Sequence, residues 1–347
     1  MFRSLKAAVF GKTVVFGLFL LLFAKANLAR AEVCTTQSQM KEAERLALSA
    51  AARGLAQKVQ ANDAAGVRSE MVAEYATDFE AIRSVLASTA PHLQGASAQV
   101  EGVYLLDAEQ MKLAAGAKSG DAQFFCSLNR SQAEVDFLIP GLTPGRYGFA
   151  LVGFSGSATP WRVSFLLRQE GGRWLMAGLY QEATTAAGHD GLWYWTEARR
   201  LAAAKERWDA WIYFRKAEQL MRPAEFVRSS HLEKLEDEQR SDAPPALSSG
   251  VSAETPLIVK GADGAEYRFT DISADDAMSH DKVDLVAHLR VEATGDPVAA
   301  RKRNLDAMRA LLAAYPELRQ AFHGVWMFAD ATGGAPFATE QSMAEIH

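Results

Sequence analysis

Few side chains of this sequence have the types and spacing that catalysis needs. The nearest match to the turn that exposes a nucleophilic serine is Gly153-Phe154-Ser155-Gly156-Ser157, in which serine replaces the last glycine of that motif. The segment also lies between two runs that alternate like antiparallel strands, whereas the motif requires a strained turn from a strand into a helix. We interpret these residues as a loop.

The seven histidines are scattered along the chain and offer no metal site. His189 beside Asp190 is the nearest approach to a positioned base, and His231 with Glu233 or Glu236 is the next. No His-x-x-x-His pair is present to hold a metal on one face of a helix. The sequence thus predicts no catalytic residue, no metal site and no cofactor.

The first 31 residues are typical of a signal peptide. Three basic residues precede an apolar run at residues 14–24, which is shorter than the roughly 20 residues of a membrane span. Residues 29–31, Ala-Arg-Ala, offer a small-x-small cleavage site. Cleavage there leaves Glu32 as the first residue of a periplasmic or secreted protein.

An uncleaved N-terminal anchor is the alternative. Lys25 and Arg30 follow the apolar run, where charge hampers processing, and residues 13–24 then hold the chain in the inner membrane. Lipid attachment at Cys34 is not expected, because Val33 stands where a lipobox has a small residue.

Composition and charge bear on the class of partner. The 347-residue chain is 49% hydrophobic and 23% charged, which is ordinary for globular domains, and it is long enough for two or three of them. Removing residues 1–31 takes away five basic residues and no acidic one, so the formal charge changes from -5 to -10. A negative chain argues against nucleic acid or an anionic membrane surface as the main partner.

Two cysteines remain after cleavage, Cys34 and Cys126. An even number of cysteines in a chain sent to an oxidising compartment favours a disulfide. The bond would tie the new N-terminus to the strand-like run at residues 124–128. The alternative is a buried Cys126 with an exposed, free Cys34.

The first predicted elements of the mature chain are helices. In residues 37–93 the apolar side chains recur at helical spacing in two runs. Asn62-Asp63 separates the runs and caps the second, and Pro91 ends it. Two or three helices are therefore expected before the first strand.

From about residue 97 to residue 180 the hydrophobic period changes from helical to alternating. Turn signals such as Pro144-Gly145 and Gly171-Gly172 separate the alternating runs. Helices followed by a meander of antiparallel strands predict an α+β domain over residues 32–182, in which the helices cover one face of the sheet.

This order of elements resembles the NTF2-like (SnoaL-like) cone fold over residues 37–182. The closing hairpin at residues 162–180, with its Gly171-Gly172 turn, carries the resemblance together with the helical lead-in. The resemblance implies a curved antiparallel sheet around a pocket. A β-sandwich is the alternative fold, because residues 139–147 are similar to the turn-and-strand segment of small exported sandwich domains.

The resemblance also implies where a site would lie. NTF2-like enzymes place a polar dyad, often Asp with His or Tyr, inside the cone, where a dry pocket shifts the carboxyl pKa toward the working pH. Tyr75, Asp78, Tyr104 and Asp107 are the candidates by location. Many NTF2-like domains, however, only bind ligands.

Helical spacing returns in residues 183–240 with many aromatic side chains. Small and apolar residues are placed much as in a single tetratricopeptide unit, at Ala198, Leu201, Ala210, Phe214 and Ala217. One helical hairpin cannot bury its own aromatic face, so we expect it to dock on the sheet domain. The tryptophans of this segment are then core residues. Alternatively, they form a face that stacks on a ligand or docks a protein. They are Trp193, Trp195, Trp208 and Trp211.

The C-terminal third is predicted to be separable. Residues 241–256 have the composition of a linker, and residues 257–347 predict a small α+β domain. Asp296-Pro297 is a cap followed by a first-turn proline, which marks the start of the one helix in this domain.

Together these features predict an exported, non-catalytic envelope protein that binds a protein partner or a small apolar ligand. The alternative is an isomerase or hydratase acting in the cone pocket. The content of the pocket discriminates between them. Converging carboxyl and imidazole or phenol groups in a closed cavity favour the enzyme, whereas an apolar or filled cone favours binding.

Overall fold

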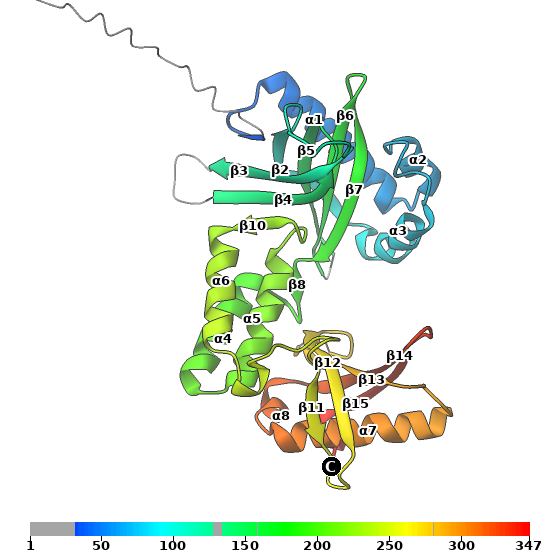
Figure 1. Cartoon of the computed structure of the whole chain (residues 1–347), viewed down its shortest axis with the longest axis vertical. Coiled ribbons are helices and arrows are strands. Elements are labelled where there is room, and N and C mark those ends of the chain that lie inside the picture. Colours follow the sequence, from blue (N-terminus) through cyan, green and yellow to red (C-terminus); the bar gives the residue numbers. More distant parts are fainter. Residues whose placement is uncertain (1–31, 128–133, 158, 280) are drawn as a thin grey trace, which may run out of the picture. The chain divides into compact units, whose positions relative to one another are not determined.

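The alternating apolar residues of the sequence form the strands on which the rest of the protein is built. The computed structural model describes residues 32–127, 134–157, 159–279 and 281–347, and they form a mixed α+β protein with several antiparallel sheets (Figure 1). The α+β class is confirmed. The expected signal peptide or anchor lies outside the described residues.

The main sheet of the N-terminal part has five antiparallel strands in the order β1-β2-β5-β6-β7. Its central strands carry apolar residues at consecutive positions, because both faces of the sheet are covered. The strands are β1 (Val33–Thr36), β2 (Ser97–Asp107), β5 (Arg146–Ser155), β6 (Trp161–Glu170) and β7 (Arg173–Ala183).

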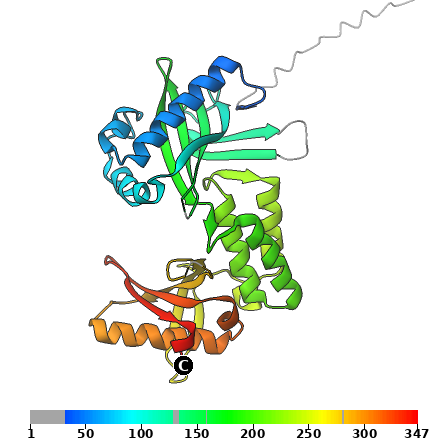
Figure 2. The same cartoon turned by 180° about the vertical axis from the view of Figure 1, so that it is seen from behind.

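Three helices cover one face of this sheet, and α1 lies across it in Figure 2. They are α1 (Glu42–Gln60), α2 (Ala64–Ser69) and α3 (Glu80–Leu93). Asp63 caps α2 as expected, accepting a hydrogen bond from the Gly66 N–H at 2.8 Å. The expectation that Pro91 ends the last helix was wrong by two residues, because a proline in the final turn removes only one helical hydrogen bond.

A second sheet covers the other face of the main sheet. Its order is β10-β4-β3, from β3 (Gly120–Ser127), β4 (Glu134–Leu142) and β10 (Val227–Ser229). Phe124 and Phe137 from this sheet pack against Tyr147 and Phe149 from the main sheet. The structure thus combines a helix-covered sheet with the sheet-on-sheet packing of the sandwich alternative.

The expected disulfide is present and joins the two sheets. Cys34 of β1 is bonded to Cys126 of β3, with their Cα atoms 5.3 Å apart. Cys126 is buried, so the bond lies inside the core between the sheets.

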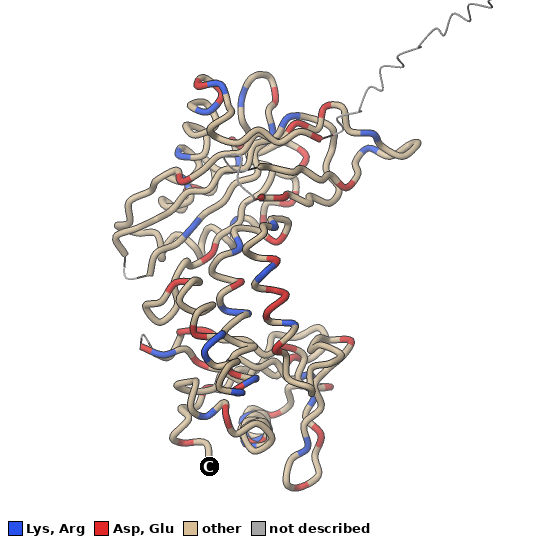
Figure 3. Tube along the Cα trace, turned by 90° about the vertical axis from the view of Figure 1, so that its left-hand side faces the viewer, with Lys and Arg blue, Asp and Glu red and all other residues tan. Residues whose placement is uncertain are grey.

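The following segment has three helices where the sequence suggested a pair. After the short strands β8 (Thr185–Ala186) and β9 (His189–Asp190) come α4 (Gly191–Ala204), α5 (Arg207–Met221) and α6 (Ser230–Ser241). Basic and acidic residues are interspersed along these helices (Figure 3), as in the ion pair between Arg199 and Glu238 at 2.6 Å.

The C-terminal module is a five-stranded sheet in the order β11-β12-β13-β14-β15, with α7 connecting the parallel strands β13 and β14. Asp296 caps α7 as expected, accepting from the Ala299 N–H at 3.0 Å. The elements are β11 (Leu257–Lys260), β12 (Glu266–Asp275), β13 (Asp284–Val291), α7 (Pro297–Ala314), α8 (Leu318–Ala321), β14 (Gly324–Ala331) and β15 (Phe337–Ser342).

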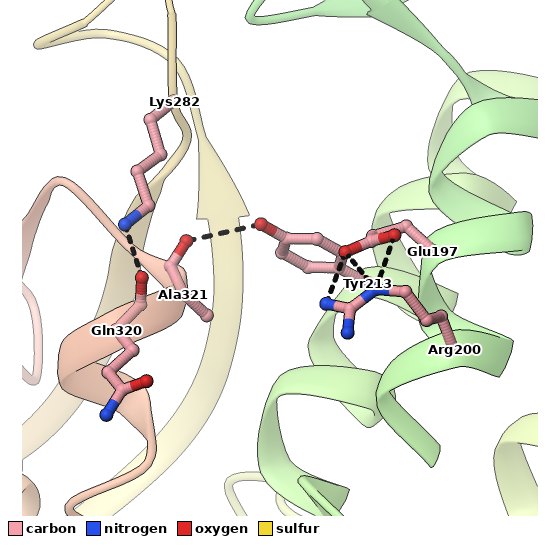
Figure 4. A network of polar contacts seen from close by, with 6 residues as sticks. All are labelled: Glu197, Arg200, Tyr213, Lys282, Gln320 and Ala321. Atoms are coloured by element: carbon pink, nitrogen blue, oxygen red, sulfur yellow. Dashed lines mark hydrogen bonds and ion pairs between the residues drawn. The ribbon is translucent and has the colours of Figure 1, made fainter. Parts of the chain in front are cut away.

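The aromatic side chains of the helical segment pack against this C-terminal module. Trp195 and Trp208 belong to one buried cluster that continues through Phe269 and Phe322. The Tyr213 hydroxyl donates to the Ala321 carbonyl oxygen at 3.2 Å (Figure 4). The sequence predicts instead that the sheet domain covers the aromatic face and that the C-terminal part is separable. In the structure, α5 lies against β12 and α8 of the C-terminal module and also contacts β7 of the main sheet.

The segment expected to be a linker is also packed. It contains a 3₁₀ turn, η1 (Pro245–Leu247), whose Leu247 is buried in the same cluster, and Val251 packs beside it. A second 3₁₀ turn, η2 (Met343–Glu345), follows β15. The domain boundaries proposed from the sequence stay a prediction.

Candidate functional site

A pocket of about 430 Å³ lies between the two sheets of the N-terminal part. Strands β5, β6 and β7 of the main sheet form one wall, and β4 with the segment before β10 forms the other. Its lining is mainly apolar and aromatic: Tyr75, Leu138, Ile139, Pro140, Gly141, Leu142, Tyr147, Leu166, Ala177, Tyr180, Glu225 and Phe226.

The strand pleat places the tyrosines of the main sheet in the pocket. Tyr147 belongs to the face of β5 that is opposite the helices, and Tyr180 belongs to the same face of the sheet on β7. Tyr180 lies over Gly178, where an added Cβ would come within 2.8 Å of the phenol oxygen. Glycine at this position therefore makes room for the ring.

The far wall comes from a segment distant in sequence. The Phe226 ring makes edge-to-face contacts with Tyr180 and Phe149, at centroid distances of 5.1 and 5.4 Å. The backbone carbonyl oxygen of Phe226 accepts a hydrogen bond from the Leu138 N–H at 2.9 Å. The residue after Phe226 begins β10, which pairs with β4. These contacts fix Glu225 and Phe226 beside the pocket.

The three phenols of the pocket are neutral at physiological pH. Burial, with Glu74 as a hydrogen-bonding and negatively charged neighbour, raises the pKa of Tyr75 to about 12. Burial also raises the pKa of Tyr147 and of Tyr180, and Glu225 adds to the effect on Tyr180. Each phenol therefore keeps its proton and can donate a hydrogen bond.

The polar groups of the pocket are not equally available. Tyr147 donates to the Thr143 carbonyl oxygen at 2.8 Å, so its proton is already engaged. Glu225 is the one charged side chain in the lining, and it is exposed. The pocket thus offers apolar walls with a few polar groups, the usual composition of a small-molecule site.

One of the four candidates from the resemblance reaches this pocket, Tyr75. Asp78 lies in a separate groove with Arg68 and Arg83. The Tyr104 ring packs edge-to-face on Phe137 within the core between the sheets, at 5.2 Å.

Several other side chains that were considered for catalysis make contacts that stabilise the fold. Asp107 is the fourth candidate, and its carboxylate accepts from the Glu109 N–H at 3.0 Å, which is a local turn contact. His189 stacks on Trp193 with ring centroids 3.7 Å apart, and Asp190 caps α4 by accepting from the Trp193 N–H. Glu236 forms an ion pair with Arg222.

The space between the helices and the main sheet holds a hydrophobic core instead of a site. Leu48, Leu55 and Val59 of α1 meet Val152 and Phe165 of the sheet there. In the part of the chain that the structure describes, no cluster of three or more His, Cys, Asp or Glu side chains is arranged to hold a metal ion. Among the same residues, no helix has the length and apolar character to cross a bilayer.

The pocket could not be predicted from the sequence. Tyr147 and Tyr180 could be recognised as alternating strand residues, but two sheets with a space between them could not. Glu225 and Phe226 follow the predicted domain boundary at residue 182, and nothing in the local pattern connects them to β7. No protein-family model, no curated protein and no solved structure matches this chain.

Proposed function

We propose that this protein is an exported binding protein whose pocket between the two sheets receives a small apolar ligand. The observation that carries the proposal is the lining of that pocket, apolar walls with three neutral phenols and one carboxylate at the rim. Its volume of about 430 Å³ lies in the range of small-molecule sites, roughly 300–1,000 Å³.

The lining favours binding over isomerase or hydratase chemistry. Such an enzyme needs a base and an acid converging on one buried point, with pKa values tuned by their surroundings. The lining residues include no imidazole, and their one carboxylate is exposed. The proposal therefore assigns ligand orientation to the Tyr180 phenol, because Tyr147 donates to Thr143 and Tyr75 is hydrogen-bonded to Glu74.

The packing also favours a small ligand over a protein partner. Trp195 and Trp208 are buried in the core of the described structure, so they offer no docking face. Trp193 is 39% exposed, but its ring is stacked on His189.

Export and an NTF2-like origin of the N-terminal part belong to the same proposal. A buried disulfide suits an oxidising compartment, and the helices packed on an antiparallel sheet suit the resemblance. Mass spectrometry of the mature protein tests the first point. The expected N-terminus is Glu32, and a full-length chain retained in the membrane would contradict cleavage.

A pocket-filling variant tests the ligand site. Ala177 lines the pocket, and Ala177→Trp should occupy much of it. The neutral fluorescent probe N-phenyl-1-naphthylamine should bind the wild type with a blue-shifted, enhanced emission, and the variant should lose at least about tenfold in affinity.

Ala115→Trp is the matched control, because Ala115 is exposed in the loop between β2 and β3 and does not line the pocket. It should bind the probe as the wild type does. Equal binding by both variants, or no binding by the wild type, would refute the proposed function. Circular dichroism of each variant checks that it is folded.

A further inference from the structure

The pocket between the two sheets is called the tyrosine pocket below. A second cavity, of about 370 Å³, lies beside it and is lined mainly by charged and polar residues. Its walls come from the end of β7, one face of α5, the segment that follows α5, and β12. Lys216 of α5 is the most deeply buried charged residue in this lining, at 5% exposure.

Among the described residues, Lys216 has fewer partners than a buried ammonium needs. Its described hydrogen bond is to Gln219 Oε1 at 3.2 Å, a neutral acceptor, although an ammonium has three N–H donors. Burial lowers the pKa of Lys216, while the more distant Asp275, Asp276 and Glu182 oppose the shift. A buried charge without an ion pair is costly, so an additional acceptor would be strongly favoured.

Most of the other charges in this cavity are already paired. Arg215 binds Asp271 at 2.8 Å, and Arg222 binds Glu218 at 2.9 Å. Besides Lys216, the charged lining residues without an ion pair among the described residues are Glu182 and Glu225.

The charges of this lining that form no ion pair among the described residues are of both signs, so they suit a ligand that also carries both. Burial raises the pKa of Glu182, and the positive charges of Arg162 and Lys216, neither of which forms an ion pair with it, oppose that rise. An anion fits the buried Lys216, and a cation fits the two carboxylates, of which Glu225 is the exposed one.

The two cavities adjoin each other. Glu225 lines both of them. Tyr180 of the tyrosine pocket and Glu182 of the charged cavity are two residues apart in the sequence of β7. They therefore lie on the same face of the strand, with their Cα atoms roughly 7 Å apart. A single elongated molecule can reach from one to the other along β7.

We propose that the two cavities bind one ligand, an apolar chain between the sheets with a zwitterionic head group whose anion meets Lys216 and whose cation meets Glu182 and Glu225. This inference rests on the proposed function, because the chain occupies the tyrosine pocket. The ligand class is a single-chain amphiphile with a phosphate or carboxylate and an ammonium group.

Competition between matched amphiphiles tests the head group. Wild-type protein loaded with N-phenyl-1-naphthylamine is titrated with lauroyl lysophosphatidylethanolamine, lauroyl lysophosphatidic acid or monolauroylglycerol, each below its critical micelle concentration, and displacement of the probe is measured. The three share one acyl chain and differ in the charge of the head. The zwitterionic compound should displace the probe at a concentration about tenfold lower than the neutral one, and lower than the purely anionic one.

Lys216→Met removes the buried charge and keeps an unbranched side chain that is one atom shorter. This variant should lose the preference for the zwitterion while binding the probe with unchanged affinity, which also shows that it is folded. Lys216→Arg should retain the preference. Lys234→Met is the matched control, since Lys234 is exposed on α6 and lines neither cavity.

The outcomes separate this inference from the proposed function. Failure of the probe to bind the wild type would refute the proposed function, namely that this pocket binds an apolar ligand. Probe binding with equal displacement by all three amphiphiles would refute only the head-group site. A Lys216→Met variant that keeps the full preference, or a wild type that prefers the anionic compound, would also overturn the zwitterionic assignment.

Discussion

Asp209 is a buried carboxyl in the first turn of α5. It is 1% exposed, and its Oδ1 has no hydrogen-bond partner among the described residues. Burial, with Glu317 and Glu206 as negative neighbours, raises the pKa of Asp209 from 3.8 to about 7, and Lys282 opposes the rise. The folded protein therefore retains a proton between about pH 4 and pH 7 that the unfolded chain has released.

This residue makes the free energy of unfolding depend on pH. Because the folded state binds the extra proton, the stability contributed by Asp209 falls as the pH rises from about 4 to about 7 and is constant above that. Asp209→Asn should be more stable than the wild type at pH 8 by about 1–3 kcal/mol and equally stable at pH 4. Urea unfolding at the two pH values measures the difference.

Asp237→Asn is the control, because Asp237 is an exposed carboxylate on α6 that pairs with Arg240. It should change stability by less than about 1 kcal/mol at either pH. A difference between Asp209→Asn and the wild type that is the same at pH 4 and pH 8 would show that folding does not raise the pKa of Asp209.

At the scale of elements, the approach of α4 to α5 depends on one glycine. Gly191 is the first residue of α4, and an added Cβ would come within 3.0 Å of the Ala217 carbonyl oxygen and collide with the Met221 side chain. The absence of a side chain at residue 191 thus sets the distance between the start of α4 and the end of α5.

Alanine substitutions at two helical glycines should have opposite effects. Gly191→Ala should destabilise the protein by about 1–3 kcal/mol, because the new methyl group overpacks the helix contact. Gly54→Ala should stabilise it by roughly 0.5–1 kcal/mol, because Gly54 lies in the interior of α1 with no atom near the added Cβ. Urea unfolding of both variants measures the pair. Two shifts of the same sign would contradict the close helix contact.

Local patterns predicted elements well and their partners poorly. The caps at Asp63 and Asp296 and the alternating strands were recognised because each follows from a few neighbouring residues. Strand β10 was missed because three residues are too few to show a period. The pocket depends on that strand, so its far wall could not be predicted from the sequence.

At the scale of the whole molecule, the helical segment and the C-terminal module share one hydrophobic core. Trp208 packs on Tyr315 with ring centroids 4.2 Å apart, and Tyr213 packs edge-to-face on Phe322. Arg215 adds a hydrogen bond to the Ile272 carbonyl oxygen at 2.6 Å. We expect these parts to unfold together.

Deleting residues 257–347 should therefore expose the aromatic face of α5. The shortened protein, residues 32–256, should self-associate or precipitate under conditions where residues 32–347 are monodisperse. Sedimentation velocity makes the comparison. A soluble monomer with the tryptophan emission of the longer protein would show that Trp208 and its neighbours are covered without the C-terminal module, as the sequence had suggested.

The disulfide joins the two sheets of the N-terminal part covalently at one of their edges. It fastens β1, at one edge of the main sheet, to β3, at one edge of the second sheet. At the other edge, beside β7, the described contacts are noncovalent, chiefly Phe226 against Tyr180. Reduction of this bond should lower the free energy of unfolding by about 2–4 kcal/mol and leave the two sheets held together by packing alone.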